Sequence, residues 1–67
     1  MRVTINGQIH DLDDDAKTIA HVVDHLGLRD RRVAVELNQS IIKRATYAEQ
    51  QITNGDIIEI VHFVGGG

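Results

Sequence analysis

Residues 57–67 read Ile57-Ile58-Glu59-Ile60-Val61-His62-Phe63-Val64-Gly65-Gly66-Gly67, an almost wholly apolar run that ends in glycines. A continuous run of branched apolar residues is typical of a central β-strand whose two faces are at least partly covered. Glycine has no Cβ and reaches backbone conformations that are closed to other residues. Such a tail adds little to packing, but it can enter a narrow channel and present its last atoms to another protein. The tail is therefore either an inert terminus or the reactive part of the chain.

The start of the chain predicts a β-hairpin. Val3 and Ile5 alternate with polar residues, which is the pattern of a half-buried strand. Asn6-Gly7 follows and is a strong turn signal, because both residue types accept positive φ. The next run predicts a second strand up to Leu12, but Ile9 and Leu12 have opposite parity. A bulge or an early end of the strand would reconcile them.

One amphipathic helix is predicted after this hairpin. Thr18 is a suitable N-cap, and Gly27 stands where a glycine ends a helix. The apolar residues of one face recur at helical spacing: Ile19, Val22, Val23 and Leu26. The opposite face carries Ala20, His21, Asp24 and His25.

Three further strands are expected in the second half of the chain. Alternation predicts one at 33–37, and a turn separates it from a short strand at 41–42. The polar segment 43–51 is expected to be a short helical or irregular piece anchored by Tyr47. A turn at Thr53-Asn54-Gly55-Asp56 precedes the last strand, 57–64. The element order gives an α+β fold.

Composition limits the function. A chain of 67 residues forms one domain, and it contains no cysteine, so disulfides and thiolate metal sites are excluded. The formal net charge of −3 argues against nucleic acid as a partner, since phosphate binding needs a basic surface. No apolar run approaches membrane-spanning length, and the start lacks the apolar core of a signal peptide. We expect a cytoplasmic protein that is monomeric when free.

The chain resembles the thiamin-biosynthesis sulfur carriers of the ThiS type, which belong to the ubiquitin-like β-grasp superfamily. The resemblance rests on Asn6-Gly7, on Asn54-Gly55-Asp56 and on the ending Glu59-Ile60-Val61-His62-Phe63-Val64-Gly65-Gly66-Gly67. It implies a mixed sheet of strand order 2-1-5-3-4 with one main helix packed across one face. Residues 1–63 would form the β-grasp domain and residues 64–67 a flexible glycine tail.

The resemblance also implies a chemistry for the C-terminus. In the family, an ATP-dependent partner adenylates the terminal carboxylate, here that of Gly67 after Gly66. A cysteine desulfurase system then supplies sulfur, and the resulting thiocarboxylate donates it to thiazole synthase. The chain would bind no cofactor of its own, because ATP and Mg²⁺ are used by the adenylating partner. On this interpretation the chain is a protein substrate and not an enzyme. A carrier without cysteine cannot hold sulfur as a persulfide, which fits this scheme.

The last strand also predicts a docking surface. If Ile58 and Ile60 face the helix, alternation places Ile57, Val61 and Phe63 on the opposite face of the sheet. The predicted docking residues are Val61, Phe63, Ile57, Val64 and Gly65. An exposed apolar cluster of this kind marks a partner site. The alternative is that the segment 43–51 covers this face, and the sequence leaves both open.

The histidines give only a weak indication of a metal site. His21 and His25 stand four residues apart on the polar helix face, but a zinc site needs about four ligands. The acidic turn at 13–15 lacks the spread ligands of a calcium-binding loop. We therefore expect no metal. His10 is predicted to be an exposed strand residue, and His62 to lie at the rim of the helix side.

Three other functions remain open. The small subunit of molybdopterin synthase has the same fold and thiocarboxylate chemistry but a different acceptor. A ubiquitin-like protein modifier would form isopeptide bonds with lysine; this chain offers only Lys17 and Lys43 for polymer chains, which disfavours a polymer tag but leaves single tagging open. A β-grasp interaction domain with an inert tail is the third.

Overall fold

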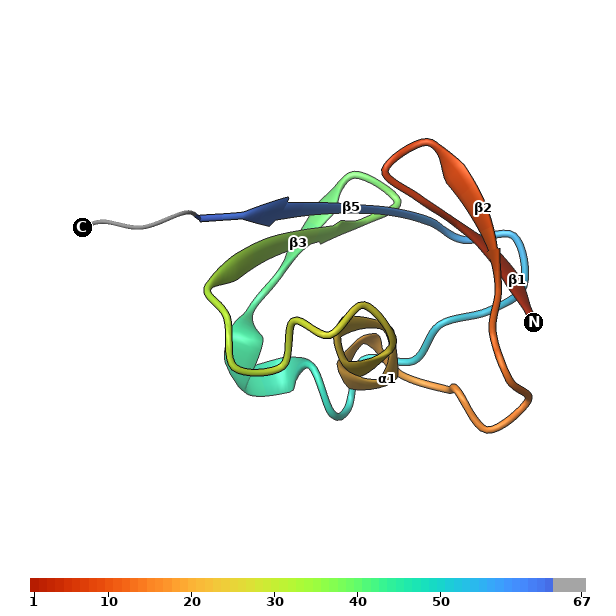
Figure 1. Ribbon diagram of the computed structural model, residues 1–67, viewed down its shortest axis with the longest axis horizontal. Coiled ribbons are helices and arrows are strands. Elements are labelled where there is room, and N and C mark those ends of the chain that lie inside the picture. The colour runs from red at the N-terminus through yellow and green to blue at the C-terminus, as the bar shows by residue number, and fades with distance from the viewer. Residues whose placement is uncertain (64–67) are drawn as a thin grey trace.

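The computed structural model describes residues 1–63 of the chain. The described part contains one five-stranded sheet and one α-helix, and the helix crosses one face of the sheet (Figure 1). The elements in chain order are β1 (Arg2–Ile5), β2 (Gln8–Asp11), α1 (Ile19–His25), β3 (Val33–Leu37), β4 (Ser40–Ile42), the 3-10 helix η1 (Arg44–Thr46) and β5 (Ile57–His62). No helix within residues 1–63 has the length and apolar content needed to cross a bilayer.

The central strand of the sheet is β5. The strand order is β2-β1-β5-β3-β4, with β5 parallel to β1 and antiparallel to β3. The hairpins β1-β2 and β3-β4 are antiparallel pairs, and β5 lies between them. The predicted strand order and the single helix across one face are confirmed. The N-terminus and the C-terminal end of β5 lie toward opposite ends of the long axis (Figure 1).

The core lies between the sheet and α1. Its largest fully buried side chains are Ile19, Ile58, Val3, Val22 and Val35. These residues come from α1 and from the three inner strands, as the alternation and the helical spacing predict. Because burying a large aliphatic side chain contributes about 1.5–3 kcal/mol, this small set supplies much of the stability of the domain.

Both ends of α1 are capped as predicted. Thr18 forms a capping box in which its hydroxyl accepts from the His21 backbone N–H while the His21 side chain accepts from the Thr18 backbone N–H. At the other end Gly27 takes a φ of 72°, and the Leu28 N–H donates to the Val23 carbonyl at 3.0 Å. Together with the Gly27 N–H, which donates to the Asp24 carbonyl at 2.9 Å, this bond forms a Schellman motif, which ends the helix at a left-handed glycine.

The boundaries of three strands differ from the prediction, and the smallest difference is at β4, which begins at Ser40 and not at Ile41. The second strand ends at Asp11 and not at Leu12, so the chain leaves the sheet before Leu12 and this side chain turns into the core. Ile9 stays on the outer face, where it is 68% exposed. The early end of the strand therefore explains the opposite parities of Ile9 and Leu12. The last strand is assigned only to His62, and Val64 lies outside the described residues.

Candidate docking surface on the outer face of β5

The side chains of β5 alternate between the core and the open face of the sheet. Ile58 and Ile60 are 0% and 6% exposed and face α1. Ile57 and Val61 point the other way and are 54% and 58% exposed, and Phe63 just beyond the strand is 57% exposed. The predicted exposure of these three apolar residues is confirmed. Their role in docking stays a prediction, because exposure alone identifies no partner.

The segment 43–51 does not cover this face. It folds into η1 and a turn on the same side of the sheet as α1 (Figure 1). The Ala20 N–H donates to the Tyr47 carbonyl at 3.0 Å, and the Ile19 N–H donates to the Gln50 carbonyl at 2.9 Å. The half-buried Tyr47 packs against the core, which confirms its predicted anchoring role. The alternative of a covered outer face is therefore wrong.

The strand register adds two carboxylates to the outer face. Glu59 lies directly opposite Glu36 of β3, and both are exposed. Ile41, which is 78% exposed, stands opposite Glu36 on β4. Facing like charges on neighbouring strands destabilise a sheet. Glu36 was missing from the predicted docking residues because the register between strands cannot be read from one sequence.

Side chains from the β3-β4 turn and from the turn before β5 fix the start of β5. The Ile57 N–H donates to Asn38 Oδ1 at 2.9 Å, and the Asn38 N–H donates to the Ile57 carbonyl at 2.8 Å. Asn38 Nδ2 donates to Asp56 Oδ1 at 3.0 Å. Asp56 Oδ2 accepts from the Thr53 N–H at 2.7 Å, which closes the predicted turn. These bonds set where the outer face of β5 begins.

The residues predicted to form the reactive end come after the part of the chain that the structure describes. Gly66 and Gly67, predicted to carry the adenylate and the sulfur, lie outside the described residues. The same holds for the docking candidates Val64 and Gly65 and for the predicted flexible tail 64–67. The structure therefore bears only on the strand from which this tail continues.

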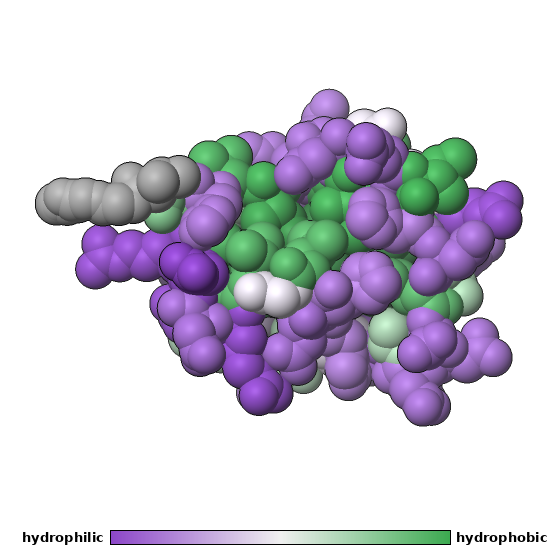
Figure 2. All heavy atoms as spheres, viewed as in Figure 1, coloured by the Kyte–Doolittle hydropathy of each residue, from purple (hydrophilic) through white to green (hydrophobic). Residues whose placement is uncertain are grey.

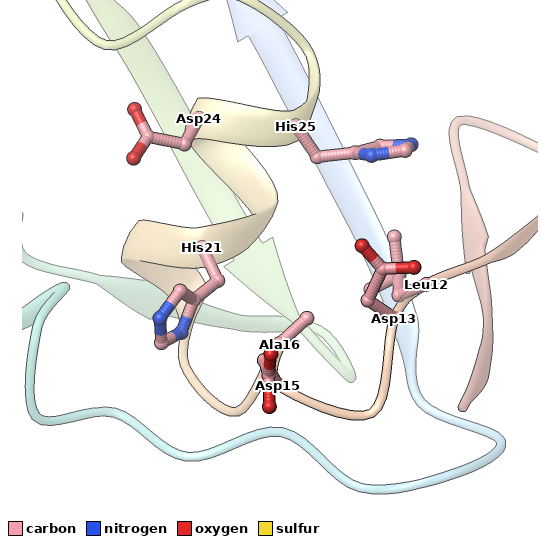
Figure 3. Close-up of a pocket in the computed structure, with 7 residues that line it drawn as sticks. All are labelled: Leu12, Asp13, Asp15, Ala16, His21, Asp24 and His25. Atoms are coloured by element: carbon pink, nitrogen blue, oxygen red, sulfur yellow. The ribbon is translucent and has the colours of Figure 1, made fainter.

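A shallow hollow lies beside the first turn of α1. It has a volume of about 300 Å³ and is lined by Leu12, Asp13, Asp15, Ala16, His21, Asp24 and His25 (Figure 3). The rings of His21 and His25 point in different directions (Figure 3). His21 Nδ1 accepts from the Lys17 and Thr18 N–H groups at 3.1 and 3.2 Å, so this nitrogen already serves the helix cap. Among residues 1–63 no three His, Cys, Asp or Glu side chains are grouped to hold a metal ion.

The prediction for His10 is wrong. His10 is half-buried, because its register opposite Val3 turns it to the helix side of the sheet. Its ring meets that of His25 edge to face, with 5.7 Å between the centroids. His62 is exposed at the rim on the same side, as predicted.

Apolar atoms reach the surface between the sheet and α1 (Figure 2). A second hollow of about 280 Å³ lies on the helix side of the sheet. Its apolar lining comes from Ile5, Leu26, Leu28 and Ile60, and its polar lining from Asn6, Gln8, His10 and His62. It lies on the face of the sheet opposite Val61, so it is not part of the outer docking face.

Two pKa shifts arise from one surface pair. Arg2 Nε lies 3.0 Å from Asp11 Oδ1 across the first hairpin. The hydrogen bond and the charge of Arg2 hold the pKa of the Asp11 carboxyl below its usual value, and Asp11 raises the pKa of Arg2. Burial raises the pKa of the Tyr47 hydroxyl. None of these three groups belongs to β5.

A mixed sheet of this strand order, crossed by one helix, defines a ubiquitin-like β-grasp protein. Its central strand carries exposed apolar side chains on the open face of the sheet. The sequence matches the ThiS family over residues 3–67. The chain therefore belongs to the ThiS family, as the resemblance predicted. It is 40% identical to the sulfur carrier protein ThiS of Bacillus subtilis over 63 residues, which covers 94% of this chain and 96% of the relative. The crystal structure of the thiamine biosynthesis protein ThiS from Geobacter metallireducens superposes with a TM-score of 0.81 at 28% identity, covering 100% of both chains.

A longer protein also matches. The chain is 37% identical over 67 residues to a thiazole synthase of Paramagnetospirillum magneticum. The match takes in 100% of this chain but only 20% of that relative. The chain thus spans about a fifth of the length of this thiazole synthase.

Proposed function

We propose that this chain carries sulfur for thiamine biosynthesis as a thiocarboxylate on Gly67. One observation carries the proposal: the family match extends from residue 3 through the glycine tail to residue 67. The relative from Bacillus subtilis, covered almost end to end, is named a sulfur carrier protein. The proposal requires a free α-carboxylate on Gly67 in the mature protein. Because the activating step consumes ATP, we expect the carrier to work in the cytoplasm.

The terminal carboxylate needs activation before sulfur can enter. Its charge is delocalised, and the leaving group of a direct attack would be oxide. In the proposed sequence a carboxylate oxygen attacks the α-phosphorus of ATP, pyrophosphate leaves and an acyl adenylate forms on the partner enzyme. A persulfide sulfur supplied by a cysteine desulfurase then attacks the carbonyl carbon, and AMP leaves. A thiol reduces the resulting acyl disulfide, which leaves the thiocarboxylate on the carrier and a disulfide on the donor. Every catalytic group in this scheme belongs to a partner.

The outer face of β5 is the surface that we assign to docking. Its exposed apolar area comes from Ile57 at the start of β5 and from Val61 and Phe63 at and just beyond its C-terminal end. Glu36 and Glu59 place two carboxylates within this area. A partner that covers them must supply a cation, since a buried unpaired carboxylate is strongly unfavourable. We therefore expect the adenylating enzyme to present arginine or lysine between apolar side chains.

The acceptor proposed for the sulfur is thiazole synthase. A protein bearing that name contains a segment similar to this whole chain. Joining a carrier to its acceptor in one polypeptide would raise their effective concentration, as a linker does for any pair of binding modules. We expect the acceptor and the adenylating enzyme to compete for the same outer face.

The test is an intact-mass measurement of the full chain. The chain is incubated with ATP, Mg²⁺, its adenylating enzyme, a cysteine desulfurase, cysteine and a reducing thiol. We expect a gain equal to the mass difference between one sulfur and one oxygen atom. The gain should vanish without ATP and in a variant that lacks Gly67. An unchanged mass, measured with an enzyme that is active on another carrier of the family, would refute the proposal.

A further inference from the structure

The hairpin turn at Asn6 marks the point where β1 leaves β5. The backbone pairing of these two strands consists of Thr4 opposite Ile57 and Ile5 opposite Ile58. The Asn6 N–H still donates to the Ile58 carbonyl at 2.9 Å. Asn6 itself has a φ of 50°, which turns the chain away from β5 into the hairpin. A regular parallel ladder would need a further peptide group of β1 to pair with Ile60.

The side chain of Asn6 takes the place of that peptide group. The Ile60 N–H donates to Asn6 Oδ1 at 2.7 Å, and Asn6 Nδ2 donates to the Ile60 carbonyl at 3.0 Å. A carboxamide has the same donor and acceptor as a peptide unit, so it can bond both polar groups of one residue. Both bonds are partly buried, and the Ile60 residue that they hold is 6% exposed.

These two bonds are the last ones on their side of β5 within residues 1–63. Beyond Ile60 the strand is held from the other side, where Val33 pairs with His62 and the Phe63 N–H donates to the Arg32 carbonyl at 3.0 Å. Val61 and Phe63 follow Ile60 directly along the chain. The orientation of Val61 and Phe63 therefore depends on the two hydrogen bonds between the Asn6 side chain and the backbone of Ile60.

We infer that Asn6 is a positioning residue for docking: its carboxamide extends the β1–β5 ladder by one step and holds the end of β5 in the orientation that partners bind. The inference rests on the proposed function. It goes beyond the turn role of Asn6, since glycine or aspartate would also accept the left-handed backbone there.

The chain offers a matched control in Asn38. Asn38 also has a positive φ, of 49°, lies in a hairpin turn and accepts a bond from β5, but it does so at Ile57, the start of the strand. We compare Asn6→Gly with Asn38→Gly, since glycine removes each side chain and keeps the backbone free of strain. Asn6→Asp is a third variant, because it keeps an acceptor for the Ile60 N–H but loses the donor to the Ile60 carbonyl.

Two measurements are made on each full-length variant at a temperature where all are folded. The first is ATP–pyrophosphate exchange by the adenylating enzyme, with the carrier as the varied substrate. For Asn6→Gly and Asn6→Asp we expect KM to rise about tenfold with kcat nearly unchanged, because pre-organisation acts on binding. Asn38→Gly should raise KM by less than about threefold, because it loosens only the start of β5 and leaves the bonds to Ile60 in place. The second is amide hydrogen exchange of the free chain, where Asn6→Gly should speed exchange at Ile60 and Phe63 about tenfold beyond Asn38→Gly.

The inference is overturned if Asn6→Gly and Asn38→Gly share the same KM, or if they share the same exchange rates at Ile60 and Phe63. It is also overturned if Asn6→Asp keeps the wild-type KM, since the bond donated to Ile60 would then be dispensable. If the wild type itself supports no ATP–pyrophosphate exchange, the proposed function fails. In that case amide exchange at Ile60 and Phe63 alone tests whether Asn6 fixes the end of β5.

Discussion

Replacing Phe63 with alanine is the most direct test of the docking face. Phe63 is 57% exposed and lies just beyond β5, so its truncation leaves the core untouched. A phenylalanine buries roughly 200 Å² when fully covered, so roughly 110 Å² of Phe63 remains for a partner to cover. At about 25 cal/mol per Å² this area is worth about 3 kcal/mol as a ceiling. The conformational entropy lost on binding reduces this contribution, so we expect Phe63→Ala to weaken binding by about 1.5–3 kcal/mol, or about 10- to 100-fold in Kd.

The assay is a titration of the adenylating enzyme with the full chain by calorimetry. Ile9→Ala is the matched control, because Ile9 is also an exposed apolar residue of the outer face but lies on the edge strand β2, which β1 separates from β5. Both substitutions should change the free energy of unfolding by less than about 0.5 kcal/mol, as surface changes usually do. We expect Ile9→Ala to bind within about twofold of the wild type, since it leaves the central anchors of the interface in place. If Phe63→Ala binds as tightly as Ile9→Ala, the assignment of the docking face is wrong.

Three further outcomes are expected. Glu59→Gln should stabilise the free chain by a few tenths of a kcal/mol in urea, because it removes repulsion from Glu36. The same change should weaken binding to the adenylating enzyme and flatten its salt dependence; unchanged affinity would dismiss the cation expected on the partner. Thr18→Ala should lower the free energy of unfolding by about 1 kcal/mol through loss of the N-cap, and Thr18→Ser should restore it. Asp11→Asn tests the pair with Arg2. The pKa of Asp11 is lower in the folded chain than the unfolded value of 3.8. The ionised carboxylate therefore stabilises the fold above pH 3.8, and this stabilisation is lost as the pH falls through the folded pKa. The difference in urea midpoint between wild type and Asp11→Asn should therefore shrink on acidification below 3.8, and a difference that grows would contradict the pairing.

The sequence was sufficient for the features that depend on local patterns. Alternation placed Ile58 and Ile60 toward the helix, and helical spacing placed Val22 in the core, because period and burial are linked along one element. Thr18 and Gly27 marked the two ends of α1 through backbone rules that act over a few residues. The strand order came instead from the family resemblance.

The features that were missed depend on contacts distant in sequence. His10 was expected to be exposed, but its pairing with Val3 turns it to the helix side. The Asn6-Gly7 pattern predicted a turn, and nothing local to it indicated bonds to Ile60, which is 54 residues away. The segment 43–51 could have covered either face, and its side is decided by the bonds that the Ala20 and Ile19 N–H groups donate to it and by the packing of Tyr47 against the core.

The position of β5 between the two hairpins has a consequence for how the chain folds. The β1-β2 and β3-β4 hairpins can each form from neighbouring residues, but they share no ladder until β5 enters between them. Because joining distant segments is the slow part of folding, the insertion of β5 should limit the rate. An unfinished chain that lacks β5 holds two unconnected hairpins, and an isolated hairpin is marginally stable at best. The strand that bears the docking residues is thus also the strand that completes the fold, so a partner would meet this surface only on a chain that has already folded.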